Sequence, residues 1–246
     1  MSDLSWLTAR PIAHRGLHDL NIDRWENTLS AFEAAVAGNF AIECDVHLAA
    51  DGVPVVFHDD QLKRLTGEEG NTCDLTSVQL AELPVGGTAD RVPTLRQTLE
   101  RVAGRVPLVI ELKGIAGQDE GLVAEVGKLL SAYRGKAAIM SFDHWLVRRF
   151  ATDAPGIPYG LTAVGITQDR LEQHFSMLAH NPAFASFYAM ELPNPFTDFM
   201  RHDLARPVIT WTVRDRKTYD LTVTHADQMT FEGFNPDRPG DVAALQ

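Results

Sequence analysis

Eight short apolar segments rich in β-forming residues alternate with longer amphipathic segments along this chain. In the first amphipathic segment, residues 28–37, the apolar side chains of Leu29, Phe32, Ala35 and Val36 lie on one helical face. Alternating strands and helices favour a parallel sheet, and eight such units favour a closed barrel over a doubly wound sheet. The sequence therefore predicts an α/β fold of the (β/α)8 TIM barrel class. The expected strands are 11–14, 41–47, 108–113, 137–142, 157–161, 184–191, 208–213 and 228–231, and the expected helices are 28–37, 95–103, 120–133, 144–152, 169–180, 196–204 and 217–224.

One region departs from this alternation. The second expected strand is followed by another apolar run, residues 53–58, after Asp51-Gly52, a dipeptide typical of β-hairpin turns. Residues 59–91 then show little periodicity and contain several turn-forming residues. We expect a single catalytic barrel domain spanning 1–246, with a hairpin and a small insertion at about 59–91 between the second and third barrel strands.

The charge and composition of the chain limit its partners. It has 22 Lys and Arg against 33 Asp and Glu, a net charge of −11, which argues against binding to nucleic acid or to an anionic membrane. Neither a signal-peptide pattern nor an apolar run of membrane-spanning length occurs, so we expect a cytoplasmic protein without a membrane anchor. Cys44 and Cys73 form no CxxC pair and are expected to be reduced thiols. Nothing in the sequence predicts a particular oligomeric state.

Charged residues stand at the ends of three expected strands, and active sites of (β/α)8 enzymes lie at the carboxyl ends of the strands. The first strand leads into His14-Arg15-Gly16, which combines a residue that titrates near neutral pH with a guanidinium suited to phosphate. The second ends in Glu43-Cys44-Asp45, where alternation puts both carboxylates on one face and Cys44 towards the helices. The third ends in Glu111-Leu112-Lys113, with the same spacing of charges.

Glu43, Asp45 and Glu111 form an all-oxygen ligand set, so we expect one divalent cation, Mg²⁺ or Ca²⁺. Solvated charges, or an ion pair between Glu111 and Lys113, would explain one strand but not three strands that end alike. The hairpin would return His58 to the same end of the barrel. His58 and His14 would then supply a general acid and a general base.

A longer set of motifs carries a resemblance to a known family. In order and spacing, these motifs resemble the glycerophosphodiester phosphodiesterase family over nearly the whole chain. They are His14-Arg15-Gly16, Glu26-Asn27-Thr28, Glu43-x-Asp45, Asp51-Gly52-Val53-Pro54, His58-Asp59, Arg64-Leu65-Thr66-Gly67, Glu111-Leu112-Lys113, Ser141-Phe142 and Trp211-Thr212-Val213.

The resemblance implies a (β/α)8 barrel that hydrolyses a small-molecule glycerophosphodiester to glycerol 3-phosphate and an alcohol. Carried over by position, metal binding falls to Glu43, Asp45 and Glu111, acid–base catalysis to His14 and His58, and phosphate binding to Arg15 and Lys113. Trp211 would pack against the glycerol moiety and Phe142 would line the same wall, although both could equally be barrel-core residues. Two other functions stay open: a lysophospholipase D-type activity on lipid-sized diesters, and a barrel that binds phosphodiesters without catalysis.

Three features differ from the usual pattern of this family. Trp25 replaces proline, Arg214 replaces asparagine, and the last strand reads 227–232 Asp-Gln-Met-Thr-Phe-Glu instead of Asp-Gly-Ile-Ile-Thr-Asp. We expect these changes to affect the accepted alcohol rather than the reaction, with Trp25 reshaping the pocket entrance. His18 and His47 are expected near the mouth, with His47 past the end of the second strand. The remaining histidines are expected at the surface: His144, His174, His180, His202 and His225.

Overall fold

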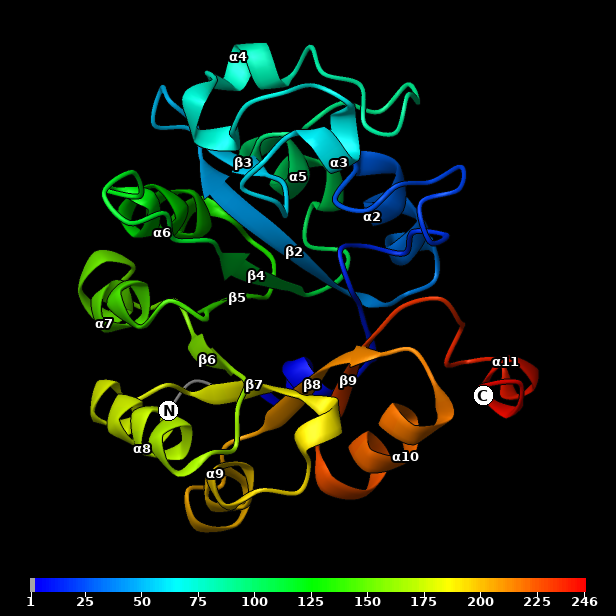
Figure 1. Cartoon of the computed structure of the whole chain (residues 1–246), viewed down its shortest axis with the longest axis vertical. Helices are drawn as coiled ribbons and strands as arrows, with labels where there is room; N and C mark the ends of the chain where they lie inside the picture. The colour runs from blue at the N-terminus through cyan, green and yellow to red at the C-terminus, as the bar shows by residue number, and fades with distance from the viewer. Residues whose placement is uncertain (1–2) are drawn as a thin grey trace.

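A computed structural model describes residues 3–246 and confirms the predicted barrel. Eight parallel strands follow one another around the sheet, and β1 pairs with both β9 and β2, which closes the ring. Figure 1 looks into this ring of strands, with the helices on its outside. The barrel strands are β1 (Ile12–Ala13), β2 (Ala41–Leu48), β4 (Leu108–Leu112), β5 (Ala137–Ser141), β6 (Tyr159–Ala163), β7 (Phe184–Tyr188), β8 (Val208–Val213) and β9 (Gln228–Phe231).

The structure contains each of the seven expected helices and adds four short α-helices that the sequence did not predict. No helix in residues 3–246 combines the length and hydrophobicity needed to cross a bilayer. The α-helices are α1 (Ser5–Thr8), α2 (Leu29–Ala37), α3 (Lys63–Thr66), α4 (Ser77–Leu80), α5 (Leu95–Val102), α6 (Leu122–Ala132), α7 (His144–Asp153), α8 (Gln168–Ser176), α9 (Pro195–Asp198), α10 (Arg216–His225) and α11 (Pro239–Ala243). Short turns of other helix types are η1 (Thr72–Asp74), η2 (Met177–His180), η3 (Ala189–Glu191) and η4 (Phe199–Asp203).

The observed strand ends lie within one residue of those expected, except in two strands. The strand predicted over 184–191 ends at Tyr188, and the chain then makes the turn η3, where Leu192 N donates to Ala189 O. The strand predicted from residue 157 begins at Tyr159, because Pro158 has no N–H to donate and Ile157 N bonds back to Ala154 O.

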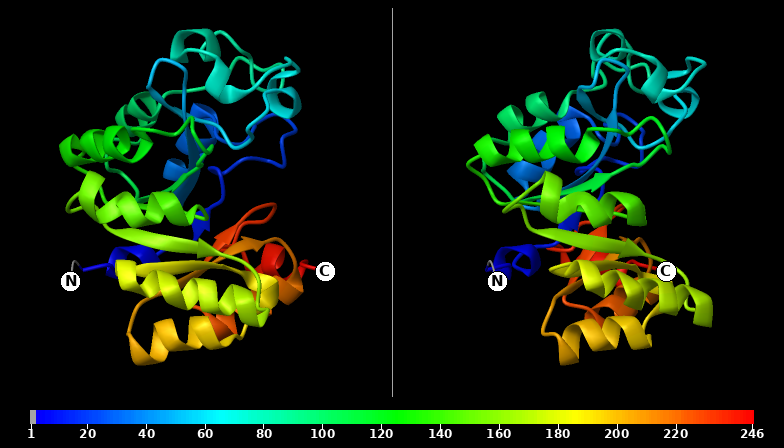
Figure 2. Two further views of the ribbon diagram at one scale, coloured as in Figure 1. Left: turned by 60° about the vertical axis from the view of Figure 1, so that its left-hand side comes forward. Right: turned by 90° about the vertical axis from the view of Figure 1, so that its left-hand side faces the viewer.

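Alternation along the strands separates two apolar layers. Cys44, Ile110 and Leu112 point outward and pack with the helices, as the sequence predicts for Cys44. A second cluster lies inside the barrel and contains Leu7 of α1. Figure 2 shows α1 near the N-terminus, at the end of the barrel from which the strands start. The strand residues of that inner cluster are Ile12, Ala41, Val109, Ala138, Met140, Phe184 and Ile209.

The extra strand β3 (Pro54–Val56) runs antiparallel to β2 and begins the region that breaks the alternation. Residues 59–91 hold α3, η1 and α4 around a small apolar cluster of their own, which includes Leu62, Leu65 and Leu80. Trp25, from the loop after β1, packs against this cluster. A Cβ added to Gly86 would lie 2.0 Å from the indole of Trp25, so the insertion is seated directly on that ring.

The inner cluster generates a stability prediction. Leu7 is 1% exposed and closes the barrel at the end opposite the strand carboxyl ends. Leu7→Ala should lower the free energy of unfolding by about 2–4 kcal/mol, because it removes buried methyl groups and leaves a cavity. Urea unfolding measures this change. Ser5→Ala, at an exposed position of the same helix, is the matched control and should change little. Equal effects of the two variants would show that α1 does not close the barrel.

Candidate active site

A cavity of about 400 Å³ opens among the carboxyl ends of the strands. The side chains that line it include all nine residues predicted from the sequence, brought together from six strands and the segments that follow them. These are His14, Arg15, Glu43, Asp45, His58, Glu111, Lys113, Phe142 and Trp211.

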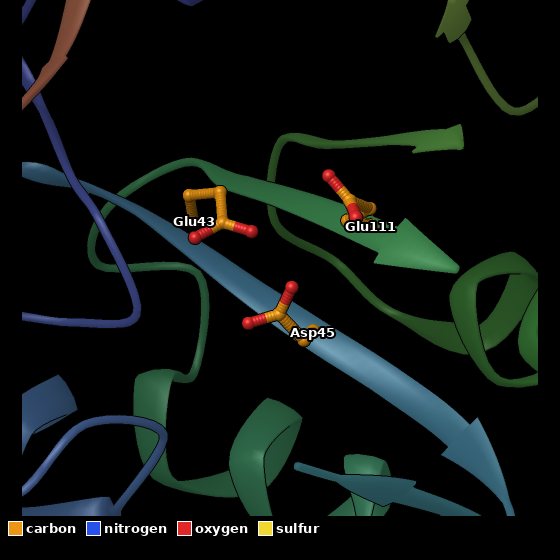
Figure 3. Close-up of side chains that lie close together, drawn as sticks. All are labelled: Glu43, Asp45 and Glu111. Carbon is orange, nitrogen blue, oxygen red and sulfur yellow. The ribbon is translucent and has the colours of Figure 1, made fainter. Parts of the chain in front are cut away.

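The three carboxylates predicted as metal ligands meet at one side of this cavity. Ligand atoms of Glu43, Asp45 and Glu111 all lie within 4.8 Å of one another, and Figure 3 shows the three groups gathered over β2 and β4. All three are buried, with 2%, 2% and 5% of their surface exposed. Burial, followed by the charges of Asp45 and Glu111, raises the pKa of Glu43 well above its usual value. Carboxylates crowded in this way need a cation among them, and these residues can hold a metal ion.

Lys113 neutralises part of this negative charge. Its ammonium lies 2.9 Å from Asp45 Oδ1 and also contacts Glu111 Oε1. Burial alone would raise the pKa of Asp45, but the positive charges of Lys113 and Arg15 outweigh it and lower that pKa. The ion pair between Glu111 and Lys113 that was considered from the sequence is therefore present. It does not by itself explain the cluster, because Lys113 also pairs with Asp45.

The backbone at the end of β1 turns sharply. Arg15 and Gly16 have φ angles of 56° and 82°, in the left-handed region. A Cβ on Gly16 would lie 2.9 Å from Ala31 Cβ, so only glycine fits there. The turn lets Arg15 N donate to Glu43 Oε2 at 2.9 Å, and places Arg15 Nε 3.4 Å from Asp45 Oδ2.

Glu26 and Asn27 of the motif Glu26-Asn27-Thr28 support the site from behind, and the sequence had given them no role in it. Glu26 accepts from Arg15 Nη1 at 2.6 Å and from Arg64 Nη2 at 2.8 Å. Burial opposes ionisation of Glu26, but the bond from Arg64 and the charge of Arg15 outweigh it and lower its pKa to about 2. Asn27 Nδ2 donates to Asp45 Oδ2 at 2.9 Å and so fixes one metal-ligand candidate.

His14 is held by Glu232. From the sequence, this residue was noted only as part of an unusual last strand. His14 Nδ1 donates to Glu232 Oε2 at 2.6 Å, since the carboxylate can only accept, and Nε2 stays free 3.9 Å from Glu43 Oε2. Arg214 Nε pairs with the other oxygen, Glu232 Oε1, at 2.6 Å. Burial lowers the pKa of His14, and the bond to Glu232 opposes this effect. Glu232 could have been found from the same signal as Arg15 and Lys113, because it is a charged residue close after the end of a barrel strand.

His58 is held in a similar way from the hairpin side. Its Nδ1 donates to Asp59 Oδ1 at 2.6 Å, and Asp59 is itself paired with Arg64. His47 Nε2 donates to the backbone oxygen of His58 at 3.1 Å. His47 lies within β2 and is fully buried, so the expectation that it lies past the strand end is wrong. Burial lowers the pKa of His58, and the charge of Asp45 opposes this effect.

Aromatic side chains form the opposite wall of the cavity. Phe142 packs edge-on against Trp211 with ring centroids 5.2 Å apart, and Tyr188 lies 5.2 Å from the same indole. Trp211 Nε1 donates to Ser186 O at 3.3 Å. Phe142 and Trp211 therefore pack against other barrel residues and at the same time border the cavity.

Two other expectations fail. Trp25 is seated under the insertion and does not border the cavity. His174, expected at the surface, is 4% exposed; its Nε2 donates to Gly165 O at 3.1 Å, and its ring packs against Phe187. Its helical spacing in α8 could not distinguish a buried from an exposed histidine.

A larger cavity of about 730 Å³ lies at the other end of the barrel, beside α1. Its charged side chains are engaged with neighbours: Arg201 pairs with Asp227 at 3.1 Å, and Arg206 Nη2 donates to Asn181 Oδ1 at 2.6 Å. The acidic cluster and the two histidines that bond to carboxylates line the smaller cavity and not the larger one.

Residues 14–241 match the model of the glycerophosphoryl diester phosphodiesterase family, which accounts for nearly the whole chain. The chain belongs to this family. It is therefore a phosphoric diester hydrolase.

Several relatives are similar over most of the chain. The Bacillus subtilis protein YhdW, provisionally named a glycerophosphodiester phosphodiesterase, is 35% identical over 84% of this chain and 87% of its own. A glycerophosphodiester phosphodiesterase of Caldanaerobacter subterraneus is 34% identical over 61% of this chain and 65% of its own. The structure of an Oleispira antarctica phosphodiesterase in complex with sn-glycerol 3-phosphate superimposes with a TM-score of 0.76, over 95% of this chain and 94% of that one, at 23% identity. At that identity, the structural likeness concerns the fold.

The low pKa of Glu26 predicts how the stability of this family member depends on pH. A carboxyl whose pKa falls from 4.5 to about 2 on folding stabilises the protein above pH 4.5, and this contribution is lost as the pH falls towards 2. At pH 7, Glu26→Gln should therefore cost roughly 3 kcal/mol of unfolding free energy. The difference from wild type should shrink between pH 5 and pH 2.5.

Urea unfolding at several pH values measures this difference. The control is Glu33→Gln, which removes a half-exposed carboxylate paired with Arg105 and should cost less than about 1 kcal/mol at every pH. A Glu26→Gln penalty that stays constant down to pH 2.5 would contradict the assigned network.

Proposed function

We propose that this protein hydrolyses glycerophosphodiesters to glycerol 3-phosphate and an alcohol with the help of one divalent cation, and that the barrel with its insertion acts as one catalytic domain. The observation that carries the proposal is the meeting of three carboxylates, two held histidines and two cations around one cavity. Membership of the family gives the reaction class, and the cavity supplies the groups that the reaction needs.

Glu43, Asp45 and Glu111 would hold the cation. Their ligand atoms are all carboxylate oxygens, which Mg²⁺ and Ca²⁺ prefer, whereas zinc sites usually contain nitrogen or sulfur ligands. When bound there, the cation supplies positive charge that polarises a phosphoryl oxygen. We favour Mg²⁺ or Ca²⁺ on this donor set.

Arg15 and Lys113 would bind the phosphate. Both border the cavity beside the acidic cluster, and both keep their charge: burial opposes it, but Asp45 and its neighbouring carboxylates raise the pKa of each cation. Their charges would stabilise the negative charge that builds up on the phosphoryl oxygens in the transition state.

His14 and His58 would move the protons. In each ring Nδ1 is committed to a carboxylate, Glu232 or Asp59, which leaves Nε2 as the atom available to the substrate. Burial lowers the pKa of both histidines and so keeps a neutral, basic form accessible near neutral pH. One ring would take a proton from the nucleophile, and the other would give a proton to the departing alkoxide.

The aromatic wall would receive the uncharged part of the substrate. Trp211 and Phe142 present apolar rings to the cavity opposite the charged groups. We propose that the carbon skeleton of the glycerol moiety packs against these rings while the phosphate lies towards Arg15 and Lys113.

The direct test incubates the protein with glycerophosphocholine, glycerophosphoethanolamine or lysophosphatidylcholine. Each reaction contains Mg²⁺, Ca²⁺ or EDTA, and glycerol 3-phosphate and free head group are measured. We expect glycerol 3-phosphate from the deacylated diesters with one of the metals and none with EDTA, because the carboxylate cluster needs its cation. Turnover of lysophosphatidylcholine alone would indicate a lysophospholipase D-type activity. Tight binding of a diester without turnover under any metal condition would indicate a non-catalytic barrel.

Replacement of the histidines tests their roles. His14→Ala and His58→Ala should each lower kcat by about 10²-fold or more, since each removes a positioned proton donor or acceptor. Steady-state release of glycerol 3-phosphate measures the loss. The matched control is His202→Ala, at an exposed position in η4, which should keep full activity. Near-normal kcat in either His14→Ala or His58→Ala would refute that assignment.

A further inference from the structure

Arg64, on the short helix α3 of the insertion, binds two carboxylates at once. Its Nε and Nη2 donate to Asp59 Oδ2 and Oδ1 at 2.6 and 2.8 Å. Its Nη1 and Nη2 donate to Glu26 Oε2 and Oε1 at 3.0 and 2.8 Å. All three guanidinium nitrogens are therefore used, and each carboxylate is bound through both of its oxygens.

The same two carboxylates hold two residues of the active site. Glu26 Oε1 accepts a hydrogen bond from Arg15 Nη1 at 2.6 Å. Asp59 Oδ1 accepts one from His58 Nδ1, also at 2.6 Å. Arg64 Nη2 donates to these same two oxygens. One side chain of the insertion thus joins a group proposed to bind phosphate with a group proposed to move protons.

Arg64 acts from outside the cavity. Neither Arg64 nor the two carboxylates that it binds border the cavity, whereas Arg15 and His58 both line it. In the described part of the chain, the His58 ring bonds to Asp59, and the Asp59 carboxylate bonds otherwise to Arg64. The orientation of the His58 ring therefore depends on Arg64 through Asp59.

Apolar packing fixes the position of α3, which carries Arg64. The neighbouring Leu65 is 1% exposed in the apolar cluster of the insertion, and its backbone oxygen accepts from Gly86 N at 2.7 Å. Trp25, which precedes Glu26 in the chain, packs against the same cluster. Figure 1 shows α3 and the loop after β1 on the same side of the barrel. The insertion is therefore seated on this loop by apolar contacts and by the ion pair between Arg64 and Glu26.

We propose that Arg64 is a positioning residue, which orients Arg15 through Glu26 and His58 through Asp59, so that the insertion serves catalysis as well as stability. This inference rests on the proposed roles of Arg15 and His58 and extends them to a residue outside the cavity. The planar guanidinium is required, because two bidentate pairs need its fixed fork of donors, which the point charge of a lysine does not provide.

Steady-state kinetics of Arg64→Lys and Arg64→Ala on glycerophosphocholine, with the activating metal, test this role. Both variants should lower kcat/KM by about 10- to 100-fold, because displacement of a reacting group by about 1 Å has an effect of this size. Arg64→Lys keeps the charge, so its loss would report the geometry. The matched control is Lys63→Ala, which removes the neighbouring, exposed ammonium that pairs with Glu69 and should keep full activity.

Double variants separate positioning from a general loss of structure. If Arg64 acts through His58 and Arg15, its replacement matters less once either residue is gone. The loss of kcat/KM caused by Arg64→Ala should therefore be at least about 3-fold smaller in the His58→Ala background, and likewise in the Arg15→Ala background, than in the wild type. A general loss of structure would instead lower kcat/KM by the same factor in all three backgrounds.

A second measurement does not depend on turnover. The Nδ1 proton of His58, bonded to Asp59, gives a ¹H–¹⁵N NMR signal that is identified by its loss in His58→Ala. Arg64→Ala and Arg64→Lys should shift or broaden this signal, because the Asp59 carboxylate loses its bidentate partner, whereas Lys63→Ala should leave it unchanged. Thermal unfolding checks the fold of each variant. Should Arg64→Ala fail to fold, Arg64→Lys decides the question, because it retains the charge between the two carboxylates.

The inference is overturned if Arg64→Lys keeps full activity and an unchanged His58 signal, or if the loss in Arg64→Ala is undiminished in both backgrounds. A loss undiminished in one background alone refutes the branch through that residue. Failure of the proposed hydrolysis is recognised separately, because the wild type then releases no glycerol 3-phosphate while the NMR comparison still reports on Arg64. A shifted His58 signal in a protein without turnover would support the positioning role and refute the proposed activity.

Discussion

The repulsion among three buried carboxylates is the constraint on which the rest of this site depends. Glu43, Asp45 and Glu111 lie within 4.8 Å of one another with almost no exposure to water, an arrangement that is unfavourable without cations. Lys113 and Arg15 stand against the cluster and supply part of the compensation. The same positive charges face the cavity, so the residues that make the acidic cluster tolerable are also those suited to a phosphate diester.

A division of the barrel into two halves follows from this arrangement. The acidic cluster, Arg15, Lys113 and the two histidines come from β1, β2, β3 and β4 and from the turns after them, whereas the aromatic wall comes from β5, β7 and β8. Phe142 and Tyr188 both pack on Trp211 there and form an apolar surface opposite the acidic cluster. A substrate with one ionic end and one carbon skeleton fits across such a cavity.

Charged neighbours determine how the two histidines of the cavity are presented. Glu232 and Asp59 each take one Nδ1 proton, and Arg214 and Arg64 in turn pair with these two carboxylates. Each ring is therefore fixed in orientation and tautomer by a carboxylate that carries its own counter-charge. Arg214 and Glu232, both departures from the usual family pattern, form one such pair, so the two substitutions are physically linked rather than independent.

The residue pattern predicted the barrel and seven of the nine residues that meet in its cavity; Phe142 and Trp211 followed from the resemblance to the family. It could do so because the helix and strand periods are local, and because a period of two places Glu43 with Asp45 and Glu111 with Lys113 on one face. The neighbours of these residues, in contrast, depend on how distant segments pack. Closure of the barrel brings Glu232 to His14 across 218 positions of the chain, and the seating of the insertion takes Trp25 away from the pocket. Burial of His174 is likewise decided by packing between distant segments, which no local pattern records.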